Sequence, residues 1–305
     1  MGIFFVLLAA VLVSISNFCM RRSIDSGGSS KAYLVVQVTC SFLIMILLNP
    51  VRTNDYAWGW QAVNLGLIGG LIFGILMWGL GKTLEKGPPG LSFAILNTSS
   101  VIPAIVLALL FGASLGHSYT FWNGGGSVLV ALGLFWAGWS STKNANKAVW
   151  LSFAALIFLA HVAFLVYLQW WAMLLRTDLP PSSLLPFHVQ SANIQWFMPA
   201  ALFVAAAMQC VIYALYERRI PKGAEVYYGI LGGITNGACT FFLILAPQKA
   251  LAWENAMLFP IFSVSVILLC NAWAQILYKE RVNWWANGLC LAGIVVGTVA
   301  WNTLL

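Results

Sequence analysis

Long apolar runs recur along the whole chain and are separated by short polar segments. A helix needs about 20 apolar residues to cross the hydrocarbon core of a bilayer, because each residue adds about 1.5 Å. The runs are continuous and rich in leucine, alanine and glycine, whereas a membrane β-barrel needs short alternating segments. They predict an all-α membrane protein with ten transmembrane helices, at 2–20, 32–48, 62–81, 88–111, 121–139, 148–175, 195–215, 226–247, 251–278 and 282–305.

The polar segment 140–147 (Ser-Ser-Thr-Lys-Asn-Ala-Asn-Lys) follows the fifth run and leaves five runs on each side. We therefore expect two units, 1–142 and 143–305. The first run, 2–20, lacks the basic start and the small-residue cleavage site of a signal peptide. We interpret it as the first helix.

Matching glycines indicate that the second unit repeats the first. The runs 62–81 and 226–247 share four glycines at a constant offset of 163, namely Gly66, Gly69, Gly70, Gly74 and Gly229, Gly232, Gly233, Gly237. Since five is an odd number, consecutive halves must face opposite ways across the membrane. Transporters built from such inverted repeats bind their substrate near the midplane, between the halves. The same glycine spacing is typical of close helix packing, and we expect both roles together.

Prolines and polar residues extend this repeat. Pro103 and Pro260 each lie inside an apolar run, and the residues six positions earlier are Asn97 and Glu254. Because proline removes one backbone hydrogen bond, we expect a local bend at each proline.

Composition supports a membrane protein and excludes other classes. The chain is 61% hydrophobic and 8% charged, whereas soluble domains carry about 25% charged residues. A soluble enzyme, a nucleic-acid binder and a secreted disulfide scaffold are therefore excluded. The six cysteines all lie in apolar runs without a Cys-x-x-Cys pair, so we expect no disulfide, no metal and no cofactor.

The net charge of +7 carries topology information. Twelve of the 15 lysines and arginines fall in the loops after odd-numbered runs. The positive-inside rule places these loops in the cytoplasm and both termini outside, and we expect a bacterial inner membrane. Most tryptophans lie at run ends, where they anchor helices at the headgroup level.

Two short stretches carry a family resemblance. They are Gly-Gly-Leu-Ile-Phe-Gly-Ile-Leu-Met-Trp-Gly-Leu-Gly (69–81), which leads into the run with Pro103, and Tyr-Lys-Glu-Arg-Val-Asn (278–283), which precedes a glycine-rich run. In these stretches the chain resembles the drug/metabolite transporter superfamily of EamA-like ten-helix proteins, and among its branches the rhamnose and glucose/ribose porters. The resemblance implies two inverted five-helix repeats and transport of a metabolite. The chain departs from the family pattern at Asn17 and its neighbours, where a Trp-Gly pair is expected, and at His117, where the family has a glutamate.

Polar side chains inside apolar runs are the candidate binding residues, because a polar group in hydrocarbon is costly unless it faces a bundle interior or a watery cavity. The substrate-binding candidates are Asn17, Trp78, Asn97, Ser100, His161, Asn236, Thr240 and Asn255. Each has a structural alternative. Amides can bond neighbouring helices, hydroxyls near a proline can satisfy freed carbonyls, and a tryptophan can anchor or pack.

Two residues are candidates for proton coupling. The runs place Glu254, alone among the carboxylates, inside a span, and they place His161 at the centre of 148–175. Burial raises the pKa of a carboxyl group, and a histidine can titrate near neutral pH. Alternatively, Glu254 is interfacial and paired with Lys249, and His161 packs against a neighbouring helix. No pair of carboxylates is placed to hold Na⁺.

The predicted function is a secondary transporter that moves a small polar metabolite by alternating access, with or without proton coupling. The alternatives are a facilitator, an exchanger or a channel-like protein. The substrate class stays open among sugars, amino acids, nucleotides and amines, and the expected partners are that solute, membrane lipids and protons. We expect no enzyme activity, since no catalytic constellation is present. The residues expected on the packed, moving helices are Gly66, Gly70, Gly74, Pro103, Gly229, Gly233, Gly237 and Pro260.

Overall fold

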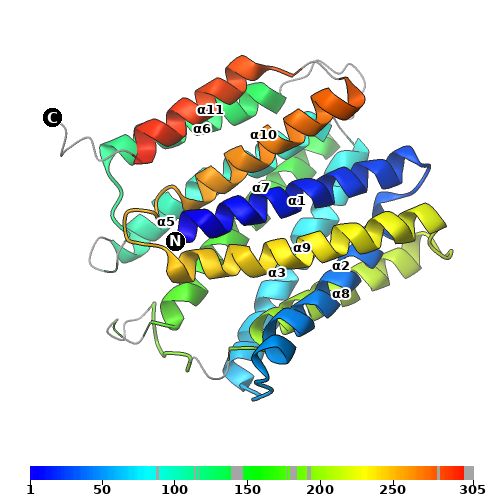
Figure 1. The fold of residues 1–305 in the computed structure, drawn as a ribbon, viewed down its shortest axis with the longest axis horizontal. Coiled ribbons are helices and arrows are strands. Elements are labelled where there is room, and N and C mark those ends of the chain that lie inside the picture. Colours follow the sequence, from blue (N-terminus) through cyan, green and yellow to red (C-terminus); the bar gives the residue numbers. More distant parts are fainter. Residues whose placement is uncertain are drawn as a thin grey trace.

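A computed structural model describes residues 1–86, 89–112, 115, 117–138, 147–176, 178, 184–190, 194–279 and 282–298. Across these ranges the protein is helical and contains no strand (Figure 1). Eight helices are long and apolar enough to cross a membrane, which is typical of a multi-pass integral membrane protein. Two shorter apolar helices, Phe121–Trp136 and Trp284–Thr298, correspond to the predicted runs 121–139 and 282–305.

The helices follow the apolar runs with shifted ends. In chain order they are α1 (Gly2–Asp25), α2 (Ser30–Ile46), the π-helical η1 (Leu47–Val51), α3 (Trp60–Lys86), α4 (Pro89–Thr98), the 3₁₀-helical η2 (Ser99–Val101), α5 (Ile102–Phe111), α6 (Phe121–Gly138), α7 (Lys147–Leu174), α8 (Phe197–Tyr216), α9 (Gly223–Lys249), α10 (Leu258–Tyr278) and α11 (Trp284–Thr298). Several helices extend beyond the hydrocarbon-length runs, because backbone hydrogen bonding continues through the charged residues at their ends.

The two prolines expected to bend spans behave differently. Pro103 follows a 3₁₀ turn, Ser99–Val101, that separates α4 from α5, so this span is interrupted as expected. The expectation of a bend at Pro260 is wrong. Pro260 lies in the first turn of α10, where a missing N–H breaks no helical hydrogen bond.

The helices are arranged in neighbouring pairs (Figure 1). At one edge α6 lies along α11, and α1 lies between α9 and α10. Further across the molecule, α2 packs against α8 and α9, and α3 packs against α7 and α8.

The glycine ladders lie at two of these contacts. A Cβ atom at Gly70 would meet backbone atoms of Ala201 in α8, and one at Gly233 would lie 2.5 Å from Cys40 Cβ in α2. Glycine therefore allows the α3–α8 and α2–α9 backbones to approach closely. Both ladders therefore lie at close helix–helix contacts.

Candidate functional site

A histidine of α7 contacts the 3₁₀ turn that separates α4 from α5. His161, in the middle of α7, is 9% exposed, and its Nδ1 lies 2.6 Å from Ser99 Oγ and 2.9 Å from the carbonyl oxygen of Leu96. Because a carbonyl can only accept, Nδ1 carries the proton that is shared with these oxygens. Ser99 Oγ also donates to the Leu96 oxygen, at 2.5 Å. The ring thus satisfies a carbonyl beside the 3₁₀ turn and joins α7 to the interrupted span.

The neighbouring polar side chains of this span differ in their bonding. Asn97 is 6% exposed, and its Nδ2 donates to the carbonyl of Phe93 at 2.8 Å, one turn earlier in α4. The hydroxyl oxygens of Thr98 and Ser100 are buried and have no hydrogen-bond partner among the described residues. Ser100 therefore retains hydrogen-bonding capacity, whereas the Asn97 amide already stabilises its own helix.

Asn236 and Thr240 lie in the contact between α9 and α2. Thr240 donates to the Asn236 carbonyl at 2.8 Å, and Asn236 Nδ2 donates to Ser41 Oγ at 3.2 Å. Ser41 Oγ donates in turn to the carbonyl of Gly233 at 2.9 Å. The two candidates therefore belong to a hydrogen-bonded helix interface.

The other predicted binding residues are dispersed. Asn17 Nδ2 lies 3.9 Å from Cys270 Sγ, between α1 and α10, and the Trp78 ring packs edge-on against Phe153 with centroids 5.7 Å apart. Asn255 is partly buried in the connection before α10. The structure thus brings Asn97, Ser100 and His161 to one region and distributes the others over different interfaces.

Glu254 lies in the connection before α10, four residues ahead of its first residue, and not within the span. The predicted run begins at 251, but residues 252–257 form turns, and α10 begins only at Leu258. The side chain is 4% exposed and accepts hydrogen bonds from Leu251 N at 2.7 Å, Gly2 N at 3.1 Å and the amino group of Met1 at 3.2 Å. Burial raises the pKa of this carboxyl group, but the backbone and amino-group donors outweigh burial and lower it overall. Glu254 therefore acts as an anionic cap on the start of α1.

We expect the Glu254→Gln variant to be less stable than the wild type by about 1–2 kcal/mol at pH 7, because it loses the charge that faces the α1 N-terminus. The folded-state pKa is lowered, so this stabilisation is present above the unfolded pKa of about 4.3 and is lost as the pH falls further. Thermal unfolding of the two purified proteins should therefore show a gap at pH 7 that closes below pH 4. Equal stability at pH 7 would contradict the capping role.

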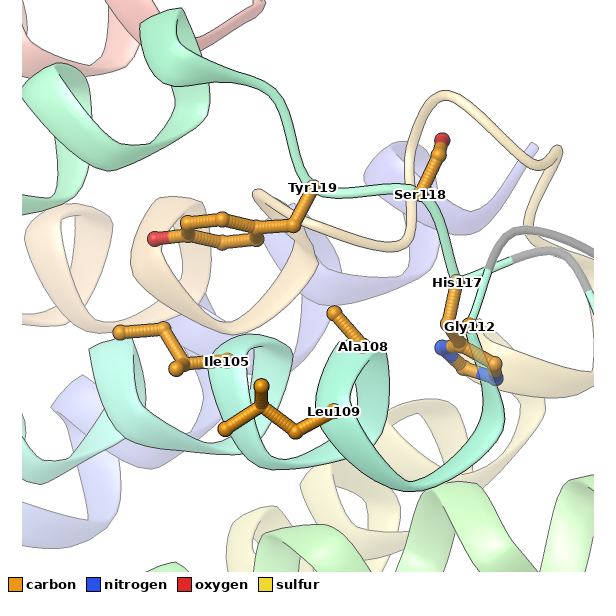
Figure 2. A pocket seen from close by; sticks show the side chains of 7 residues that line it. All are labelled: Ile105, Ala108, Leu109, Gly112, His117, Ser118 and Tyr119. Atoms are coloured by element: carbon orange, nitrogen blue, oxygen red, sulfur yellow. The ribbon is translucent and has the colours of Figure 1, made fainter.

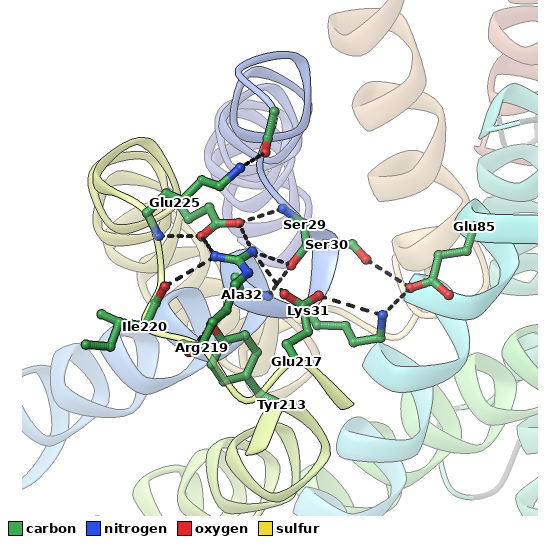
Figure 3. Close-up of polar contacts among 12 residues, drawn as sticks. Ser29, Ser30, Lys31, Ala32, Glu85, Tyr213, Glu217, Arg219, Ile220 and Glu225 are labelled. Carbon is green, nitrogen blue, oxygen red and sulfur yellow. Dashed lines mark hydrogen bonds and ion pairs between the residues drawn. The ribbon is translucent and has the colours of Figure 1, made fainter. Parts of the chain in front are cut away.

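A buried carboxylate organises the opposite end of the bundle, which we call the basic end (Figure 3). Here α1, α3 and α8 end and α2 and α9 begin. The Glu225 side chain has no exposed surface and accepts from Arg219 Nη2 at 2.6 Å, Arg219 Nη1 at 2.8 Å, Ser29 N at 2.7 Å and Lys222 N at 2.5 Å. It joins the α1–α2 connection to the α8–α9 connection.

Further ion pairs continue from this carboxylate across the basic end. Arg219 also pairs with Glu217 at 2.9 Å, and Lys31 lies 3.8 Å from Glu217 and 2.9 Å from Glu85. Lys82 pairs with Glu85 at 3.1 Å. We call these side chains the basic-end cluster, which comprises Lys31, Lys82, Glu85, Glu217, Arg219 and Glu225.

A cavity of about 470 Å³ lies where α5 ends and the chain turns toward α6 (Figure 2). Its lining residues are Ile105, Ala108, Leu109, Gly112, His117, Ser118 and Tyr119. None of them is a predicted binding residue. The Tyr119 hydroxyl donates to Ser127 Oγ at 2.9 Å, and His117 is 8% exposed. Burial first, and then the charge of Arg176, lower the pKa of His117 to about 4.

We expect acid to destabilise the protein through His117. With a folded pKa of about 4 and an unfolded pKa of about 6.5, the unfolded chain binds the proton first as the pH falls. Stability is therefore lost between pH 6.5 and pH 4, by about 2 kcal/mol at pH 5. Thermal unfolding at pH 7.5 and pH 5 should show a smaller acid shift for His117→Gln than for the wild type. Equal acid shifts would exclude this histidine as the cause.

Three features of the structure were not identified in the sequence. They are the bond between Ser99 and His161, the pairing of the buried Glu225 carboxylate with Arg219, and the buried amide of Gln169 in α7. An acidic residue three positions after Lys222 is a helix-start signal that could have indicated Glu225. Gln169 lies inside the apolar run 148–175, so the rule that selects polar residues in apolar runs could have indicated it.

Comparisons with known proteins bear on the fold. Neither a family model nor a curated protein matches the chain. A solved structure described only as "Crystal structure of protein" is similar with a TM-score of 0.70 and 15% sequence identity, over 99% of this chain and 96% of that chain. At this level of identity the similarity shows a shared fold along nearly the whole length of both chains.

Proposed function

We propose that the protein is a secondary transporter that moves a small polar solute by alternating access, and that ten spans form two inverted five-helix repeats, 1–142 and 143–305. One observation carries the proposal. In such a repeat α3 corresponds to α9 and α8 corresponds to α2, so the α3–α8 contact and the α9–α2 contact are equivalent. Both pairs are in contact, each through the matching glycine ladder.

Other helix contacts are consistent with the same correspondence between the two halves. The packing of α1 along α9 corresponds to the packing of α7 along α3, and α6 with α11 corresponds to itself. The α4–η2–α5 span is interrupted at η2, and His161 packs against this turn. Transporters of this kind bind substrate at discontinuous helices, so the interruption supports a binding region beside η2. The resemblance to the drug/metabolite transporter superfamily is in line with this proposal.

In this proposal the basic end faces the cytoplasm of a bacterial inner membrane, and both termini lie outside. The basic-end cluster then closes the cytoplasmic side. It connects α2 and α3 of the first half with the α8–α9 connection of the second half. Opening toward the cytoplasm requires these ion pairs to separate, so the cluster is a natural closing contact in the transport cycle.

A facilitator or exchanger without proton coupling is the second candidate, and the bonding of Glu254 favours it. A carboxylate that accepts hydrogen bonds from three backbone N–H groups and an amino group is stabilised in its ionised form. Proton coupling through Glu254 requires the start of α1 to move away from it. Otherwise His161 is the remaining candidate for carrying a proton.

The proposal is tested with purified protein. A thermal-shift screen of the detergent-solubilised protein against a metabolite library identifies solutes that stabilise the folded form. The best solute is then used for uptake into liposomes. Saturable uptake that is accelerated by unlabelled solute inside the vesicles supports a carrier. Linear, non-saturating flux points to a channel. No binding and no flux across the whole library would refute the transport function.

A further inference from the structure

Gln169 is a buried amide without a partner. Its side chain lies in α7 and is 2% exposed, and neither Oε1 nor Nε2 has a hydrogen-bond partner among the described residues. The other two buried glutamines of the described ranges are bonded: Gln37 Nε2 donates to Ser16 at 2.8 Å, and Gln209 Nε2 donates to the Gly74 carbonyl at 3.2 Å. An unpaired amide in the apolar interior is costly, so its presence needs an explanation.

The position of Gln169 relates it to the interrupted span. It follows His161 by eight residues, so it lies about 12 Å further along α7 and about 80° around the helix axis. His161 contacts the 3₁₀ turn η2 through Ser99. α7 also contacts α4 and α5 on either side of this turn, so both residues lie on the helix that packs along the interrupted span.

Other unpartnered polar groups come from segments packed against the same turn. The buried hydroxyl oxygens of Thr98, Ser100 and Ser263 have no hydrogen-bond partner in the described part of the chain. Ser100 belongs to η2, which contacts both α7 and α10, and Ser263 lies in α10. The contacting segments η2 and α10 thus both contain uncharged hydrogen-bonding groups without a partner.

No free buried charge accompanies these groups in the described ranges. The buried carboxylates there are Glu225 and Glu254, and both are bonded near helix ends. A charged solute brought to these groups would lack a counter-charge, which is unfavourable in the membrane interior. An uncharged solute with hydroxyl or amide groups can bond Gln169 both as donor and as acceptor.

We propose that Gln169 contacts the transported solute, and that this solute is uncharged and carries hydroxyl or amide groups. The inference rests on the proposed transport function. Oε1 of Gln169 accepts from a hydroxyl or amide N–H of the solute, and Nε2 donates to a solute oxygen. These bonds satisfy both amide atoms, which have no partner among the described residues.

The test compares Gln169→Leu with Gln209→Leu, which removes a bonded amide of the same type. Four probes are used: ribitol, acetamide, succinate and putrescine, which represent a neutral polyol, a neutral amide, an anion and a cation. Thermal unfolding is measured without and with each probe, and uptake of each radiolabelled probe is measured in liposomes. Without a probe, Gln169→Leu is expected to unfold at or above the wild-type temperature, because it removes an unpaired polar group, and Gln209→Leu is expected to unfold lower.

Wild-type protein should respond to ribitol or acetamide, and the responding probe identifies the group that is recognised. Gln169→Leu should raise the half-saturating concentration of that probe at least tenfold. The inference is overturned if Gln169→Leu leaves the half-saturating concentration of the responding probe unchanged, whatever its unfolding temperature. A lower unfolding temperature, as expected for Gln209→Leu, would then indicate a packing role. The inference is also overturned if the wild type responds only to succinate or putrescine, or to none of the four probes. The transport function is judged separately, by the library screen and the uptake that follows it.

Discussion

Replacing Gly70 with alanine is expected to separate α3 from α8 and to abolish the proposed solute transport. A Cβ at this position would meet the backbone oxygen of Ala201 and would lie 2.9 Å from its Cα atom. Backbone atoms cannot rotate away as a side chain can, so the two helices must move apart. Overpacking of this kind lowers the free energy of unfolding by about 1–3 kcal/mol. Packing is then weakened along the whole α3–α8 contact. The unfolding temperature and the rate of solute uptake in liposomes measure the two effects.

The chain supplies a counterpart and a control for this prediction. Gly233→Ala should have a similar effect, since its Cβ would lie 2.5 Å from Cys40 Cβ and 2.6 Å from the Gln37 carbonyl. Gly288→Ala in α11 should leave stability and uptake unchanged, because no heavy atom lies within 4 Å of the added Cβ. If Gly70→Ala behaved like Gly288→Ala, close packing at the glycine ladder would not matter for stability or transport.

The helices of this protein are predictable from sequence because hydrocarbon length and continuous apolar composition determine where a span lies. Helix ends are less predictable. The start of α10 shows why: the apolar run begins at 251, but Glu254 bonds the start of α1, and the helix begins only at Leu258. Pro260 then falls in a first turn, where it causes no bend. A contact with a distant segment decided the boundary, and hydropathy carries no information about that contact.

The candidate site was predictable only in part, for a related reason. A polar residue in an apolar run must find a partner, so the list of such residues could be read from the sequence. Which partner it finds depends on the packing of segments far apart in the chain. Asn236 bonds Ser41, and His161 bonds Ser99. The Asn236 amide is thereby part of a helix interface, whereas the Gln169 amide has no partner in the described residues, and neither outcome follows from the position of the residue in its run.

Replacing Glu225 with glutamine is expected to weaken the basic end of the bundle by about 1–3 kcal/mol, the cost of leaving buried hydrogen-bond donors unsatisfied. Each carboxylate oxygen accepts from one backbone N–H and one Arg219 nitrogen. In either orientation, the NH₂ group of glutamine would face two N–H donors and accept from neither. The substitution therefore does more than remove a charge, and it should lower the unfolding temperature of the purified protein.

The control is Glu85→Gln in the same cluster. Glu85 is 29% exposed in its side chain and pairs with Lys31 and Lys82, so water can replace much of what is lost. Ion pairs of this partly exposed kind contribute up to about 1 kcal/mol. The two variants make the same chemical change a short distance apart and separate the effect of a buried carboxylate from the general effect of charge.

Cys19 can report whether the basic end opens. Its side chain is 4% exposed and packs with Tyr33 and Leu34, beneath the α1–α2 connection that Glu225 holds through Ser29. In a protein whose other five cysteines are replaced by alanine, Glu225→Gln should accelerate maleimide labelling of Cys19 by up to roughly a hundredfold, the factor that about 3 kcal/mol gives an opening equilibrium. Glu85→Gln should change the labelling rate by less than about tenfold. A lower unfolding temperature with an unchanged labelling rate would mean that the cluster stabilises the fold without closing the proposed transport pathway, and that closure lies elsewhere along α2, α3, α8 and α9.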